Sequence, residues 1–185
     1  PFAGHAPELM KAAVEGGGLV IAGVGKARLV PQKVALPNAE AAFRHGITPL
    51  ISDEKLPAHA ARLDVELVPE VGAAPARVMD ALVALTSAAL QASSGVAVYF
   101  ASGDVVHPAT YVLAAVRDRL PRGWLWVGFE LGGTTAQLTL TSIGLTKVGL
   151  KELRLTSARK DIGAAIETYL DLVAMVLARG SAFPD

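Results

Sequence analysis

The stretch 94-SGVAVYFASGDVVHPATYVLAAVRDRLPRGWLWVGFEL-131 decides how the rest of the chain is interpreted. An apolar run, a polar loop, an amphipathic run and a second apolar run follow one another, which predicts a strand, a loop, a helix and a strand. We expect the strands over 96–101 and 124–131. We expect His107 and Pro108 to open the helix, since proline suits a first helical turn, and the helix to end near Leu120.

The segments on either side predict one α+β domain over residues 1–185. The helix expected over 75–91 has two adjacent apolar stripes, so its burial should extend beyond contact with one sheet. The strand expected over 61–68 alternates Leu63, Val65 and Leu67 with charged residues, which is typical of a strand with one face in water. The expected architecture is a mixed, largely antiparallel sheet with helices packed mainly on one face. Further strands are expected at 19–24, 27–34, 47–51, 137–141 and 150–155, further helices at 7–15 and 161–179, and a less regular segment at 34–57 with one helical turn at 40–44.

Charge and hydropathy limit the classes of partner. Lys and Arg number 17, Asp and Glu number 17, and neither sign forms a run. A nucleic-acid or anionic-membrane partner needs a cationic face, so we expect neither. The apolar share of 52% and the mean hydropathy of +0.43 have two open explanations. They indicate either a buried interface, with a protein partner or in a homodimer or larger homo-oligomer, or an alanine-rich composition.

The sequence contains no clear membrane-spanning segment, no signal-peptide pattern and no cysteine. The longest charge-free run, 81–103, is interrupted by Thr, Ser, Gln and Gly, which argues against a membrane helix. No signal-peptide pattern is visible, and we expect a cytoplasmic protein. The chain has no cysteine, which excludes disulfides and thiolate chemistry.

Three catalytic or binding patterns fail when tested residue by residue. Gly23-Val24-Gly25-Lys26 follows an apolar strand, but Ala27 stands where a phosphate-binding loop has Ser or Thr, so a hairpin turn is the better interpretation. A nucleophile elbow requires glycine two residues away on both sides of the serine, and Ser142 and Ser93 each have it only on the C-terminal side. The four histidines are widely spaced and none has a helical partner. We therefore expect no metal and no cofactor, and favour a protein that is not an enzyme.

The loop 101–107 is the best candidate for a site, through Ser102, Asp104 and His107. Asp104 could orient His107 as an acid–base pair or as half of a polar pocket. Alternatively, Ser102 and Asp104 could accept hydrogen bonds from amides of the loop while His107 caps the following helix. We favour this structural interpretation. The aromatic side chains of Tyr99, Trp124 and Trp126 are expected from neighbouring strands, in the core or at the rim of a pocket.

Four pieces of the chain form a recognisable series: VAVYFASGDVVHP (96–108), LPRGWLWVGFEL (120–131), LTLTSIGLTKVGLKELRL (138–155) and the final ARGSAFPD (178–185). In this order they resemble a family of bacterial domains, domain of unknown function 4261. The resemblance is strongest over 59–185 and implies a compact α+β domain of bacterial origin without an assigned reaction, cofactor or substrate. It also implies that His107 and the turns at Gly144 and Gly149 serve the fold or a shared surface, with the glycines at positive φ.

Three functional hypotheses follow. The first is a non-enzymatic protein-binding or assembly module, based on the apolar excess and the failed catalytic patterns. The second is a small-molecule-binding or hydrolytic domain that uses the Asp104–His107 loop in a concave pocket. The third, an accessory or immunity-type protein beside a secreted toxin, rests on analogy alone.

Overall fold

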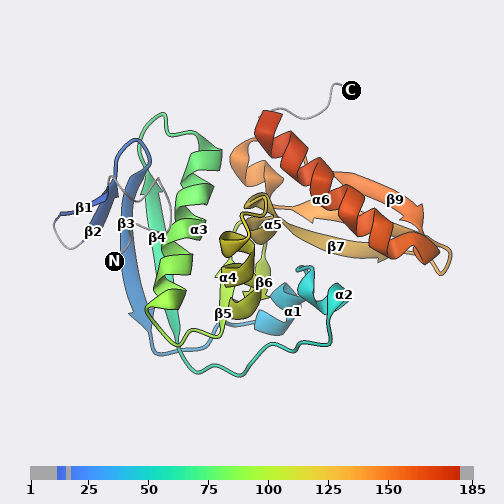
Figure 1. Ribbon diagram of the computed structural model, residues 1–185, viewed down its shortest axis with the longest axis horizontal. Helices are drawn as coiled ribbons and strands as arrows, with labels where there is room; N and C mark the ends of the chain where they lie inside the picture. Colours follow the sequence, from blue (N-terminus) through green and yellow to red (C-terminus); the bar gives the residue numbers. More distant parts are fainter. Residues whose placement is uncertain (1–11, 16–17, 180–185) are drawn as a thin grey trace.

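The computed structural model describes residues 12–15 and 18–179, and its fold is α+β (Figure 1). Within these residues the strands form three separate sheets, and all their pairings are antiparallel. The α+β class is confirmed, but the strands are divided among three sheets where one mixed sheet was expected. The first sheet has four strands in the order β1 (Ala12–Glu15), β2 (Gly18–Ile21), β3 (Gly25–Gln32) and β4 (Arg62–Pro69). The second sheet is the hairpin of β5 (Ala97–Phe100) and β6 (Val105–Pro108). The third sheet has the order β7 (Gly128–Gly133), β8 (Gln137–Ile143) and β9 (Arg154–Ala158).

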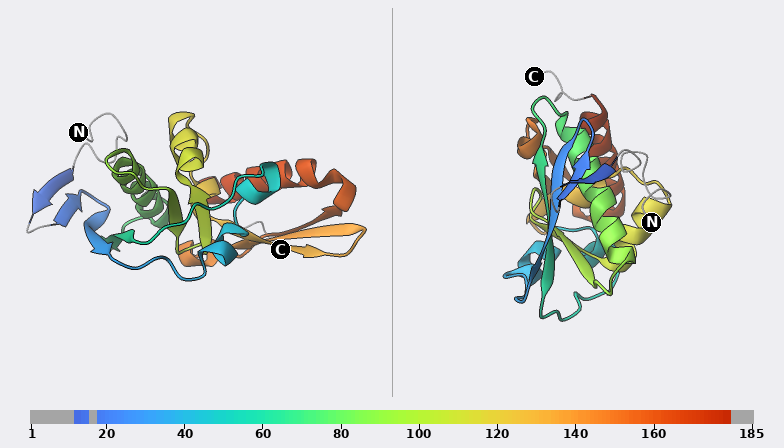
Figure 2. Two further views of the ribbon diagram at one scale, coloured as in Figure 1. Left: turned by 90° about the horizontal axis from the view of Figure 1, so that it is seen from below. Right: turned by 90° about the vertical axis from the view of Figure 1, so that its left-hand side faces the viewer.

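The main helices lie on one side of the strands. Seen from below in Figure 2, the strands run along one side of an elongated molecule, and α3, α4 and α6 run along the other. This arrangement agrees with the expectation of helices mainly on one face. The helices are α1 (Ala39–Phe43), α2 (Thr48–Ile51), α3 (Pro75–Gln91), α4 (Ala109–Arg117), α5 (Gly123–Trp126) and α6 (Ile162–Arg179), with short 3₁₀ turns at Leu145–Val148 and Arg159–Asp161.

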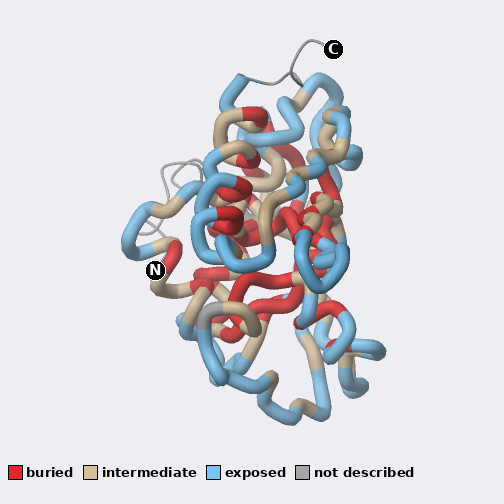
Figure 3. The backbone as a smooth tube through the Cα atoms, turned by 90° about the vertical axis from the view of Figure 1, so that its right-hand side faces the viewer, coloured by how far each residue is buried: buried red, intermediate tan, exposed pale blue. Residues whose placement is uncertain are grey.

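Helix α3 joins two hydrophobic cores, which explains its wide apolar arc. Ala81, Ala84 and Leu85 pack with residues of β2 and β3 in a small core under the four-stranded sheet. Val83 and Leu90 belong to the main core, which contains residues of β5–β8, α4, α5 and α6. Figure 3 shows the buried segments running through the middle of the molecule. At Val83 and Leu90, the wide apolar arc of α3 is therefore explained by contact with the main core.

Several predicted elements are correct and others are wrong. The helix at 75–91 is confirmed at both ends, and the helix predicted at 161–179 is α6. The segment 47–51 is the helix α2, because Pro49 in its first turn suits a helix start. The segment predicted as a strand at 124–131 begins with the helical turn α5 and becomes β7 only at Gly128. Of the helix predicted at 7–15, residues 12–15 form β1, and residues 7–11 lie outside the described part.

The predicted positive φ of Gly144 and Gly149 is confirmed, at 111° and 80°. Both glycines flank the 3₁₀ turn after β8, where the Glu152 carboxylate accepts hydrogen bonds from the amides of Gly144 (2.9 Å) and Thr146 (3.2 Å) and from the Ser142 hydroxyl. Burial by itself raises the pKa of Glu152, but these hydrogen bonds to the ionised form outweigh it and lower the pKa. The Glu152 carboxylate thus holds the turn between Gly144 and Gly149 in place.

Candidate functional site

The loop that the sequence singled out is the turn of a tight hairpin. β5 and β6 pair from Ala97–Pro108 to Phe100–Val105, and Asp104 occupies the turn with a φ of 45°. His107 and Pro108 therefore belong to β6, and α4 begins one residue later, at Ala109. The expectation that His107 opens a helix is wrong, because Val105–Pro108 finds backbone partners in β5 instead.

His107 is a core residue and does not bond to Asp104. Its side chain is 1% exposed, and its ring lies 5.1 Å from the ring of Tyr111. Nε2 lies 3.0 Å from the carbonyl oxygen of Leu125, so Nε2 carries the proton, while Nδ1 has no hydrogen-bond partner among the residues that the structure describes. Burial lowers the pKa of His107 from 6.5 to about 4, although the bond to Leu125 acts in the opposite direction. The imidazole is neutral at pH 7 and enclosed, which suits a structural role.

The histidine next to Asp104 is His45, which comes from the segment between α1 and α2. His45 Nδ1 lies 2.8 Å from the backbone oxygen of Asp104 and 3.4 Å from its Oδ2. The Tyr99 hydroxyl donates to Asp104 Oδ1 at 2.9 Å. Partial burial, and then the Asp104 carboxylate, raise the pKa of the Tyr99 phenol. Sequence reasoning missed His45, because 59 residues separate it from Asp104 and no local pattern links them.

The other three candidates have structural contacts. The Ser102 hydroxyl donates to the carbonyl of Trp126 at 3.1 Å, which ties the hairpin turn to α5. Trp126 is 2% exposed and lies in the main core. Trp124 donates from Nε1 to the carbonyl of Leu170 at 3.0 Å and so fastens α5 to α6. Both tryptophans lie on a helix and not on a strand next to Tyr99, so of the three aromatic candidates only Tyr99 lines the groove described next.

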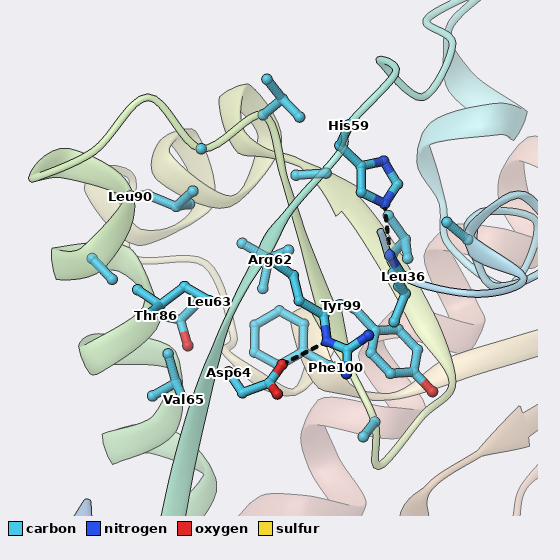
Figure 4. Close-up of a pocket in the computed structure, with 18 of the residues that line it drawn as sticks. Leu36, His59, Arg62, Leu63, Asp64, Val65, Thr86, Leu90, Tyr99 and Phe100 are labelled. Carbon is cyan, nitrogen blue, oxygen red and sulfur yellow. Dashed lines mark hydrogen bonds and ion pairs between the residues drawn. The ribbon is translucent and has the colours of Figure 1, made fainter. Parts of the chain in front are cut away.

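A groove of about 820 Å³ lies between β4 and β5 (Figure 4). Its walls are β4, β5, one side of α3, the turn after α3 and the segment before α1. In Figure 4, Leu63 and Val65 lie on the side of β4 nearer α3, where Thr86 and Leu90 are, and Arg62 and Asp64 lie on the other side. The β4 wall of the groove thus has one apolar and one polar face, in register with the alternation predicted from the sequence of β4.

Large apolar side chains are exposed at the rim of this groove. Leu63 is 43% exposed, Val96 40% and Tyr99 38%, and all three line it. On the polar side, Arg62 Nε donates to Asp64 Oδ1 at 2.9 Å, and His59 Nε2 accepts the amide hydrogen of Leu36 at 3.1 Å. Arg62 and Asp64 are only about a third exposed, so this face of β4 is less solvated than the sequence suggested.

Two further observations concern metals and membranes. Within the described residues, no three His, Asp or Glu side chains are grouped so that they could hold a metal ion. Over the same residues, no helix is both long and apolar enough to span a bilayer.

Comparison of the chain with family models, curated proteins and solved structures finds no match. The resemblance to domain of unknown function 4261 thus stays a prediction, and the functional argument rests on the site itself.

Proposed function

We propose that the chain is a non-enzymatic protein-binding module whose binding surface is the groove between β4 and β5. One observation carries the proposal: the groove combines exposed apolar side chains, Leu63, Val96 and Tyr99, with the unpaired edges of two sheets. Exposed apolar groups gathered at a concave surface are typical of sites where another molecule binds.

The placement of the polar side chains also supports binding over catalysis. The Asp104–His107 acid–base pair, which the sequence left open as an alternative, does not form, because His107 is enclosed in the core and bonds to Leu125. The Asp104 carboxylate interacts with Tyr99 and His45. The hydroxyl of Ser102, the only serine in the turn, is used in a bond to Trp126. A nucleophile, a base and an acceptor are not aligned here as turnover would require.

The experiment compares two substitutions of exposed leucines. Leu63→Arg places a charge in the groove, whereas Leu29→Arg places one at a somewhat more exposed position of β3 that does not line it. A library of random peptides, each about ten residues long to exceed the length of a typical strand, is selected on the wild-type protein. Selected peptides should bind Leu29→Arg normally and Leu63→Arg at least about tenfold more weakly, since desolvating an unpaired charge is costly. Thermal unfolding of both variants checks that they fold.

The same protein samples are run by light scattering, so that self-association is tested together with peptide binding. A dimer that Leu63→Arg dissociates would also support the proposal, with a second copy of the chain as the partner. Monomeric protein, with no peptide that distinguishes wild type from Leu63→Arg, would overturn it.

A small-molecule ligand is a second candidate, favoured by the groove volume of about 820 Å³, which lies within the usual range of ligand sites. In a thermal-shift screen of small aromatic and aliphatic compounds, this candidate predicts stabilising compounds whose effect is lost in Tyr99→Ala. Compounds that stabilise wild type and Tyr99→Ala equally, or no stabilising compound, would count against it.

A further inference from the structure

The groove lies between two sheet edges that have no neighbouring strand in the described part of the chain. Within it, β4 is the end strand of the four-stranded sheet, and β5 pairs only with β6. Among the described residues no backbone hydrogen bond joins β4 to β5. In an antiparallel ladder every second residue directs its N–H and C=O away from its partner strand. Both edges therefore present unpaired donors and acceptors toward the space that separates them.

The size of the groove suits one strand. Each residue of a strand extends about 3.3 Å along the strand, about 4.8 Å toward the next strand and about 10 Å through the sheet. The volume that one residue occupies in a sheet is therefore about 160 Å³. The groove volume of about 820 Å³ then corresponds to about five residues. This is close to the length of β5, which has four residues.

The two sides of the groove define which side chains such a strand would carry. Toward α3 it would meet Leu63, Val65 and Leu90, so alternate residues should be apolar. On the other side, Arg62 is bonded to Asp64, and Arg28, outside the groove, to Glu66. Asp104 has no Lys or Arg partner in the described part of the chain, and its carboxylate is about half exposed. A basic residue at this end of the strand would supply the missing charge.

We infer that the groove receives an extended peptide segment of a partner protein as an inserted strand, which joins the four-stranded and two-stranded sheets into one. A Lys or Arg of that segment pairs with Asp104. This inference rests on the proposed function and adds the binding mode and the chemistry of the partner. Strand addition to exposed sheet edges is an established way to bind peptides, with affinity from the backbone and selectivity from alternate side chains.

The test uses backbone methylation, since a methyl group on a peptide nitrogen removes one hydrogen-bond donor. Peptides selected on the full chain are synthesised with a single N-methyl group at each central position in turn. A strand held between two edges uses all its central amides, so each methylation should weaken binding by about tenfold or more. A strand added to one edge uses only every second amide, so an alternating pattern would overturn the insertion.

A second measurement tests the charge. Replacing the basic residue of a selected peptide with Glu should weaken its binding to wild-type protein, and Asp104→Asn should remove most of this preference while keeping an acceptor for Tyr99. Glu130→Gln removes an exposed carboxylate of β7, outside the groove, and is the matched control, which should leave the preference unchanged. An unchanged preference in Asp104→Asn would refute the assigned pairing.

The outcomes separate this inference from the proposed function. Peptides that are sensitive to Leu63→Arg but insensitive to N-methylation would overturn the strand mode and leave a binding module. A dimer that Leu63→Arg dissociates, without peptide binding, would also overturn the inference while keeping an assembly role. No peptide binding and no dimer would overturn both.

Discussion

Acid should destabilise this protein through His107, and His107→Gln should remove the effect. His107 has a pKa of about 4 in the folded chain against 6.5 for an ordinary histidine. Between these values the unfolded chain binds a proton that the folded chain does not, so the free energy of unfolding falls as the pH falls from about 6.5 to about 4. Below both values no further loss comes from this group.

The size of the effect follows from the shift. The difference between these two pKa values corresponds to about 3 kcal/mol in full, and about 2 kcal/mol of it is lost between about pH 7 and pH 4.5. This is a large part of the 5–15 kcal/mol, roughly, that stabilises a domain of this kind. The range ends at about pH 4.5 because carboxylates such as Glu152, whose pKa is lowered, start to contribute to acid sensitivity below it.

The assay is urea unfolding at a series of pH values, with the slope of the unfolding free energy against pH as the readout. Gln at position 107 can still donate to the Leu125 carbonyl but does not titrate in this range. A lower stability of this variant at pH 7 would not affect the test, because only the slope matters. A wild-type stability that does not change from pH 7 to 4.5, or a slope that persists in His107→Gln, would refute the reasoning.

Two further predictions concern stability. Glu152→Gln should lower the free energy of unfolding by about 1–3 kcal/mol in urea titrations, because the backbone amides of Gly144 and Thr146 lose a charged acceptor. Glu130→Gln, on the exposed part of β7, should change the free energy of unfolding little. Equal effects of the two substitutions would contradict the stabilising role of the Glu152 carboxylate. Gly103→Ala should lower the melting temperature, because the added Cβ would lie 2.4 Å from the Trp126 carbonyl oxygen. Gly163→Ala in α6 is the control: among the described residues its Cβ meets nothing within 4 Å, and it should raise the free energy of unfolding by a few tenths to ~1 kcal/mol. A Gly103→Ala protein as stable as wild type would show that the close approach relaxes without cost.

Local sequence patterns were sufficient where neighbours along the chain decide the structure. The apolar period of 75–91 predicted α3 to the residue, because periodicity and the Pro75 start act within the helix itself. The positive φ that the family resemblance implied for Gly144 and Gly149 is also present, since glycine accepts this conformation at no steric cost. The same local reasoning failed at His107-Pro108, which suits a helix start but pairs with β5 in the folded chain.

The sequence by itself determined the class of the fold, the main helices, the alternation of β4 and the absence of thiol chemistry. Only the tertiary structure decided that Asp104 contacts His45 and Tyr99, that His107 is enclosed, and that β4 and β5 face each other across a groove. The physical reason is the separation along the chain over which each effect acts. Periodicity and turn preferences act over a few residues, whereas burial, pKa shifts and unpaired sheet edges depend on segments that meet only after the chain has folded.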